Sequence, residues 1–165
     1  MRALTYRART LDVETPILGS ILPSNEAHVR RGLDMVLNEG KRKVGVLGFS
    51  FKAGTDDLRE SPIVELIERL IGKGFDLRLY DRNVHLAKLT GANRDYILNH
   101  IPHIAGLMRE SMQEVMDHAD VVVIGNGAPE FTQVPSLLRA GQKVIDLVRI
   151  KADFRGNAQY AGICW

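Results

Sequence analysis

The sequence predicts an α/β fold with a parallel sheet, because short apolar runs alternate with amphipathic segments along most of its 165 residues. The apolar runs that are typical of buried strands occupy residues 44–49, 75–80, 121–124 and 143–147. Apolar residues recur at helical spacing over residues 62–73, 111–118 and 134–140. Strands that are separated by helices pair in parallel through right-handed crossovers. We therefore expect a Rossmann-like open parallel sheet with flanking helices.

Residues 1–40 differ from this pattern, because they contain no run of the strand type. Three residues are expected to break the segment into pieces: Pro16, Gly19 and Pro23. Ser24 is a suitable N-cap, and the apolar spacing that follows predicts a helix over residues 25–38. Residues 1–10 resemble the tail of another helix, which we expect to begin outside this chain. The expected organisation is a helical segment over 1–40 and a Rossmann-like domain over 41–165.

Composition and charge argue against several classes of partner. The chain has 45% hydrophobic and 25% charged residues, and its net charge of +2 gives no sign of a nucleic-acid partner. No segment approaches the roughly 18 apolar residues of a membrane span. The single cysteine, Cys164, cannot form a disulfide within the chain, so a reducing compartment is expected. We expect a cytoplasmic protein that binds neither nucleic acid nor membrane.

The segment that follows the first expected strand carries the most chemistry. It begins at Gly48 and contains the cations Lys52 and Arg59. It leads into a helix with Ser61 as N-cap and Pro62 at the first helical position. It has neither a GxGxxG pattern nor the glycine-lysine-serine/threonine order of a phosphate loop. The free N–H groups of a helix start favour an anion, and both cations can donate charge-assisted hydrogen bonds. Three carboxylates would hold the cations or bond sugar hydroxyls: Asp56, Asp57 and Glu60. On composition alone, a solvated surface loop is an equally good interpretation.

Two stretches of this loop resemble a known signature, namely Gly48-Phe49-Ser50-Phe51-Lys52 and Thr55-Asp56-Asp57-Leu58-Arg59-Glu60-Ser61-Pro62. Both are similar to the last domain of the UDP-glucose/GDP-mannose dehydrogenase family. The resemblance continues at residues 4–8, 18–25, 79–81 and 162–165, so it covers essentially the whole chain. Ser50, Ala53-Gly54, the segment over residues 4–8 and the Cys-Trp ending are most similar to members that act on GDP-mannose in alginate biosynthesis.

The resemblance implies an enzymatic reaction that requires more of the protein than this domain. Members of the family oxidise a sugar C6 alcohol to a carboxylate in two NAD-dependent steps, through a thiohemiacetal on a cysteine. It implies GDP-mannose as substrate, GDP-mannuronate as product, NAD as cofactor and a homodimer formed through a central helical region. In this pattern, the position of Lys52 contacts the nucleotide sugar, and the position of Arg59 reaches toward NAD, whose pyrophosphate suits a forked cation.

The family also has parts that we do not expect among these 165 residues. Its nucleophilic cysteine lies just before the stretch that residues 1–8 resemble, and its first domain carries a GxGxxG motif. Cys164 corresponds to a tail position and not to the nucleophile. We therefore expect no catalytic residue in this chain and no oxidation by it alone.

Three alternatives remain open. The chain could be the last domain of a UDP-glucose 6-dehydrogenase, because the base preference is not fixed by physical arguments. It could instead be a stand-alone nucleotide-binding module of Rossmann type. A third interpretation is an oligomerisation domain in which residues 1–38 pack against a copy of themselves.

Several other residues allow more than one interpretation. Asp81 could bond ribose hydroxyls or cap its strand, and its position 33 residues after Gly48, rather than about 20, favours the cap. Asn126 could face the ligand or occupy a tight turn that needs a positive φ. We interpret Phe49 and Phe51 as core residues. Four histidines fit no metal-ligand spacing, so no metal site is expected: His85, His100, His103 and His118.

Overall fold

The computed structural model of the chain describes residues 2–84, 95, 99, 102–150 and 159–163. Its first helices are α1 (Arg2–Thr10) and α2 (Pro16–Asn38). The strands are β1 (Lys43–Leu47), β2 (Asp76–Tyr80), β3 (Val121–Ile124), β4 (Lys143–Asp146) and β5 (Gln159–Gly162). Between them lie α3 (Pro62–Gly72), α5 (Ile104–Leu107), α6 (Met112–His118), the 3-10 helix η1 (Pro129–Gln133) and α7 (Val134–Leu137). Cys164, His85 and His100 lie outside the described residues.

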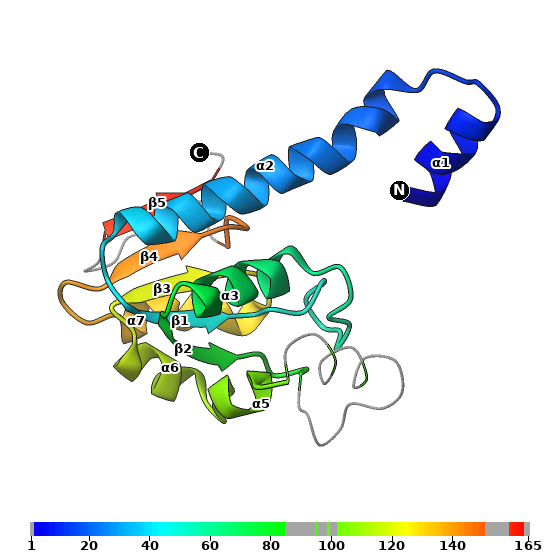
Figure 1. The fold of residues 1–165 in the computed structure, drawn as a ribbon. Coiled ribbons are helices and arrows are strands. Elements are labelled where there is room, and N and C mark those ends of the chain that lie inside the picture. Colours follow the sequence, from blue (N-terminus) through cyan, green and yellow to red (C-terminus); the bar gives the residue numbers. More distant parts are fainter. Residues whose placement is uncertain (1, 85–94, 96–98, 100–101, 151–158, 164–165) are drawn as a thin grey trace.

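The strands of the described residues form one parallel sheet in the order β2-β1-β3-β4-β5 (Figure 1). This confirms the predicted α/β fold with an open parallel sheet. The fifth strand was not predicted, because its sequence Gln-Tyr-Ala-Gly has too little apolar character to stand out; it is defined by backbone pairing with β4. In a doubly wound sheet of this order, ligands bind beyond the carboxyl ends of β1 and β3, where the strand order reverses.

Side chains of the strands point alternately to two apolar layers. On one side, Val121 and Val123 of β3 pack with residues of α2 and α3. On the other side, Val122 and Ile124 pack with residues of α6, η1 and α7. The sheet is therefore covered on both faces, as the continuous apolar runs in the sequence predicted.

The prediction that Pro23 interrupts the first helical region is wrong. Helix α2 begins at Pro16, where the missing N–H is not needed, and it continues through Pro23 to Asn38. Within a helix, a proline crowds the carbonyl four residues earlier, which is that of Gly19. Both residues are exposed, so water can hydrogen-bond the carbonyl that the helix leaves unpaired. An exposed helix tolerates this proline, whereas a buried one would leave a polar group unsatisfied.

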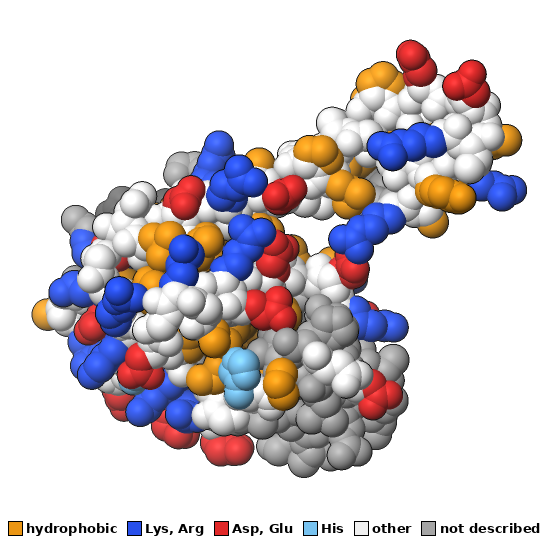
Figure 2. All heavy atoms as spheres, in the orientation of Figure 1, with side chains coloured by type: hydrophobic (Ala, Val, Ile, Leu, Met, Phe, Trp, Pro, Cys, Tyr) orange, Lys and Arg blue, Asp and Glu red, His pale blue; other side chains and the backbone are white. Residues whose placement is uncertain are grey.

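Only the last turns of α2 belong to the core. Leu33 and Val36 are buried in the apolar layer that α3 shares. The first half of α2 and all of α1 extend away from the sheet as an arm (Figure 1). Large apolar side chains are exposed on this arm, as the orange groups in Figure 2 show; they are Leu4, Tyr6, Leu11, Val13 and Ile17.

The predicted helix over residues 134–140 is also shorter than expected, because the backbone becomes extended at Leu138.

Candidate functional site

The segment that carries Lys52 and Arg59 lies at the carboxyl end of β1, where the strand order reverses. It is an organised loop that starts at Gly48 and ends at Ser61. The N–H of Phe51 donates to the carbonyl of Asp57 (2.7 Å), which closes the loop on itself. Leu58 is fully buried in the core and anchors the loop to the sheet. The arrangement gives the two cations a fixed backbone from which to project.

Asp81 joins the carboxyl end of β2 to the start of this loop. Its Oδ2 accepts hydrogen bonds from the N–H groups of Phe49 and Ser50, both at 3.0 Å, and its Oδ1 accepts one from the N–H of Asn83 (3.1 Å). The residue is only 6% exposed. The interpretation of Asp81 as a strand-end cap is therefore confirmed, and its carboxylate is occupied by backbone donors instead of facing a ribose.

Asn126 follows β3 and is neither in a left-handed turn nor an exposed ligand group. It is 5% exposed, and the structure gives it no positive φ, so that interpretation of the Gly-Asn-Gly sequence is wrong. Its amide nitrogen donates to the Ser50 hydroxyl (2.9 Å) and to Asp81 Oδ2 (3.1 Å). Its amide oxygen accepts from the N–H of Ala128 (3.2 Å). The side chain was predicted at the correct edge, but its amide is used by the side chains of Ser50 and Asp81 and by the N–H of Ala128.

Two glycines allow the ends of β1 and β3 to approach each other. Gly48 has a φ of +79°, and a Cβ there would overlap the amide of Asn126 and lie 2.7 Å from the ring of Phe131. A Cβ at Gly125 would overlap the carbonyl oxygen of Gly48. Real Cβ atoms do not tolerate such contacts, so both positions require glycine for reasons that the sequence alone did not reveal.

The loop ends at α3 as predicted, but the role of Ser61 differs from the prediction. Ser61 occupies the N-cap position, and Pro62 is the first helical residue. The Ser61 hydroxyl makes no capping bond to the helix; it donates to the carbonyl of Phe49 (2.8 Å). Because the serine is 3% exposed, this bond satisfies a buried carbonyl at the end of β1. The N–H groups of the first turn are thereby left available to other acceptors.

Lys52 and Arg59 both have exposed side chains, but their surroundings differ. Within the described residues, no ion pair involves the Lys52 ammonium. Arg59 donates from Nε and one terminal nitrogen to the two carboxylate oxygens of Asp57, both at 2.9 Å. These hydrogen bonds hold the pKa of the Asp57 carboxyl below its usual value. Glu60 pairs instead with Arg2 of α1, at 2.8 Å.

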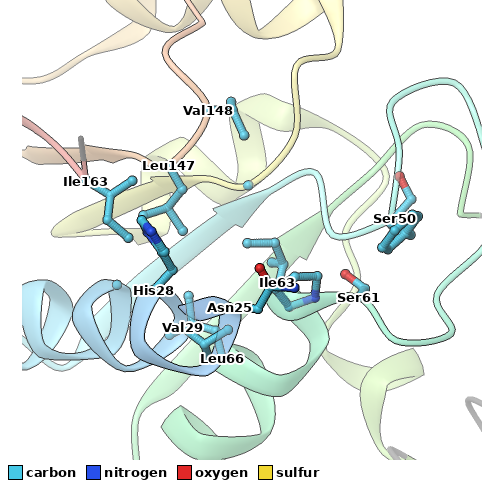
Figure 3. Close-up of a pocket in the computed structure, with 14 residues that line it drawn as sticks. Asn25, His28, Val29, Ser50, Ser61, Ile63, Leu66, Leu147, Val148 and Ile163 are labelled. Carbon is cyan, nitrogen blue, oxygen red and sulfur yellow. The ribbon is translucent and has the colours of Figure 1, made fainter. Parts of the chain in front are cut away.

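A pocket of about 300 Å³ opens beside the loop, between α2, α3 and the ends of the strands. Figure 3 shows His28 and Val29 of α2, Leu66 of α3 and Ile163 around it. Ser50 and Phe51 contribute from the loop, whereas Lys52 and Arg59 do not line it. The interpretation of Phe51 as a core residue is wrong, because the residue is 60% exposed; Phe49 is fully buried, as predicted. Strand β1 ends at Leu47, so strand alternation no longer directs Phe51 inward.

The sequence reasoning missed the contribution of α2 to this pocket. Asn25 and His28 interrupt the stripe of small and apolar residues that continues at Val29, Gly32 and Leu33. Polar residues within a stripe that faces the core are the signal that could have identified them. Their position brings side chains from residue 25 and residue 163 to one pocket, which no local pattern indicates.

Other site types find no support among the parts of the chain that the structure describes. No group of three or more His, Cys, Asp or Glu side chains there could hold a metal ion. None of the described helices combines the length and the apolar character needed to cross a membrane.

Fold and site together define a doubly wound α/β domain with a charged, organised loop at the point where the strand order reverses, the place where domains of this class bind their ligands. Residues 45–152 match the family model described as the UDP binding domain of the UDP-glucose/GDP-mannose dehydrogenase family. The chain belongs to this family.

Its relatives include two GDP-mannose 6-dehydrogenases, from Pseudomonas putida and Pseudomonas aeruginosa. Each is 50% identical over the whole of this chain, and the chain spans 38% of the length of either relative. A solved ternary complex of GDP-mannose dehydrogenase from Pseudomonas aeruginosa has a TM-score of 0.89 and 51% identity over 99% of this chain and 37% of that one. A UDP-glucose dehydrogenase from Pyrobaculum islandicum has a TM-score of 0.76 and 26% identity over 99% and 35%.

Proposed function

We propose that this chain provides the nucleotide-sugar-binding side of an NAD-dependent GDP-mannose 6-dehydrogenase, which converts GDP-mannose to GDP-mannuronate. The observation that carries the proposal is the position of Lys52, an exposed cation on an organised loop at the edge where the strand order reverses. The 50% identity to GDP-mannose 6-dehydrogenases over the whole chain supports the choice of substrate.

Lys52 is the proposed substrate-binding residue. Because no ion pair in the described residues engages its ammonium, it can donate to the diphosphate of a nucleotide sugar without first breaking a contact. The exposed ring of Phe51 and the pocket beside it offer apolar surface to the nucleoside. A charged group and an apolar surface on adjacent residues suit a ligand that combines a diphosphate with a base.

Arg59 is the proposed contact to NAD, and its geometry fits a diphosphate. Asp57 takes the edge of the guanidinium formed by Nε and one terminal nitrogen, and within the described part of the chain no hydrogen bond engages the other terminal nitrogen, which can serve a diphosphate. The side chain is 54% exposed and can therefore reach a molecule across a cleft. NAD, when bound, would accept the hydride; this chain contributes the cation that orients its pyrophosphate.

The exposed arm is the proposed dimerisation surface. Isolated apolar residues on a surface are ordinary, but α1, the start of α2 and the connection between them expose five large ones. Packing against a second copy would cover them. The proposed division is residues 1–40 for this helical region and 41–165 for the nucleotide-sugar-binding domain. The proposed setting is the cytoplasm, in the synthesis of a uronate polymer such as alginate.

Calorimetry with GDP-mannose, GDP, UDP and NAD tests the proposal on the full chain. Lys52→Ala is expected to weaken binding of GDP-mannose about 10- to 100-fold, the equivalent of one charged hydrogen bond of about 1.5–3 kcal/mol. Arg59→Ala is expected to weaken NAD binding and to spare GDP-mannose. Lys41→Ala is the matched control, because it removes the same charge before β1, at the opposite edge of the sheet. Preference for UDP over GDP would transfer the proposal to the UDP-glucose branch, and equal effects of Lys52→Ala and Lys41→Ala would refute the role of Lys52.

A further inference from the structure

A buried hydrogen-bond network connects the ends of three strands to the backbone of Lys52. It begins at Asp81 after β2, whose Oδ2 accepts from the N–H groups of Phe49 and Ser50 and from the amide of Asn126. It continues from Asn126 to the Ser50 hydroxyl (2.9 Å), which in turn donates to the carbonyl oxygen of Lys52 (3.2 Å). Direct hydrogen bonds therefore lead from Asp81 to the carbonyl oxygen of Lys52, the proposed substrate-binding residue.

The hydrogen bonds of the network determine how the amide of Asn126 is oriented. Asn126 uses its amide nitrogen for Ser50 and Asp81 and its amide oxygen for the N–H of Ala128, so its orientation is fixed. The three side chains are 2–6% exposed, and a buried network of this kind is rigid when its members are satisfied. Gly48 leaves the space in which the amide of Asn126 lies.

We propose that Asp81, Asn126 and Ser50 act as positioning residues for nucleotide-sugar binding. They do so by fixing the position of the Lys52 backbone relative to the carboxyl ends of the strands. This inference rests on the proposed role of Lys52 as a substrate contact. Ser50 also lines the pocket, but in this proposal the three side chains act through Lys52, because their polar atoms are engaged within the network. Ser50 is the decisive member, because its hydroxyl is the last link before Lys52 and the loop closes without it through Phe51 and Asp57.

A double-mutant cycle on the full chain separates positioning from ordinary stabilisation. Ser50→Ala is expected to weaken binding of GDP-mannose about 3- to 10-fold, the effect of one neutral hydrogen bond. In the Lys52→Ala background, the same substitution is expected to change the affinity less than about 2-fold, because the group that Ser50 positions is then absent. Ser136→Ala is the matched control, since that exposed hydroxyl also donates to a backbone carbonyl, that of Gln133 (2.7 Å), but outside the network. It is expected to leave the affinity unchanged.

Asn126→Ala provides a second variant, which removes the side-chain bridge from Asp81 to the Ser50 hydroxyl and leaves the bond from the Ser50 N–H to Asp81 in place. It is expected to reduce the affinity about 10-fold in the parent protein and less than about 2-fold beside Lys52→Ala. Melting temperatures establish that each variant is folded under the conditions of the titration. A purely structural role would lower the melting temperature without this dependence on the residue at position 52.

The outcomes distinguish failure of this inference from failure of the proposed function. If Lys52→Ala weakens binding but Ser50→Ala and Asn126→Ala do not, the positioning role is refuted and the substrate contact stands. Equal losses in the parent and in the Lys52→Ala background would also refute it, because the network would then act independently of Lys52. If Lys52→Ala itself leaves the affinity unchanged, the proposed role of Lys52 is wrong, and the positioning role is wrong with it.

Discussion

Three glycine-to-alanine substitutions test how the loop is held at the end of β1. Gly74 has a φ of +74° and open space around a Cβ, so Gly74→Ala introduces backbone strain alone. Gly125 has no positive φ, but a Cβ there would overlap a backbone oxygen, so Gly125→Ala introduces crowding alone. Gly48 combines the two, with a φ of +79° and overlap with Asn126.

The expected losses of unfolding free energy follow from these geometries. A left-handed alanine costs about 1–2 kcal/mol, of which about 0.4–1 is recovered because the unfolded chain is stiffer. Gly74→Ala should therefore destabilise the chain by about 1 kcal/mol. Overpacking a rigid site costs about 1–3 kcal/mol, which is the value expected for Gly125→Ala. Gly48→Ala should cost about 2–4 kcal/mol, because its neighbours Asn126 and Phe131 are buried and cannot move aside.

Urea unfolding followed by far-ultraviolet circular dichroism provides the three values under one set of conditions. The decisive comparison is between Gly48→Ala and Gly74→Ala, since both have the same backbone conformation. If their losses are equal, the close approach of the strand ends contributes nothing, and our account of the loop is wrong. A value for Gly48→Ala near the combined losses of the other two would support it.

Three further predictions concern single contacts. Ser61→Ala should lower the unfolding free energy by about 1–2 kcal/mol, because the buried carbonyl of Phe49 loses its donor; an unchanged free energy in urea titration would contradict this. Arg59→Ala should raise the carboxyl pKa of Asp57 toward the usual value of about 3.9 in a titration followed by carbon NMR. Because the pKa in the folded parent is lowered, the pair stabilises the loop at neutral pH, and this contribution is lost as the pH falls through the folded pKa. Pro23→Ala should slow hydrogen exchange in the first turns of α2, since it restores an N–H to the helix; faster exchange there would show that the proline does not weaken it.

The sequence by itself determined the fold class and the location of the charged loop that forms the candidate site. Runs such as 121–124 specify buried strands because a strand covered on both faces must be apolar at every position. The charged loop was identifiable because it follows such a run and leads into a helix that Pro62 opens. These features depend on residues that are adjacent in the sequence, so they can be predicted without the tertiary structure.

The tertiary structure alone decided which residues act together at that edge. Ser50 and Asn126 are 76 positions apart, and their hydrogen bond exists only because β1 and β3 are neighbours in the sheet. Strand β5 and the path of α2 through Pro23 likewise depend on a neighbouring strand and on solvent exposure, not on residue type. Hydrogen bonds and close packing act between atoms within a few ångströms, and the folded chain decides which distant residues come within that range.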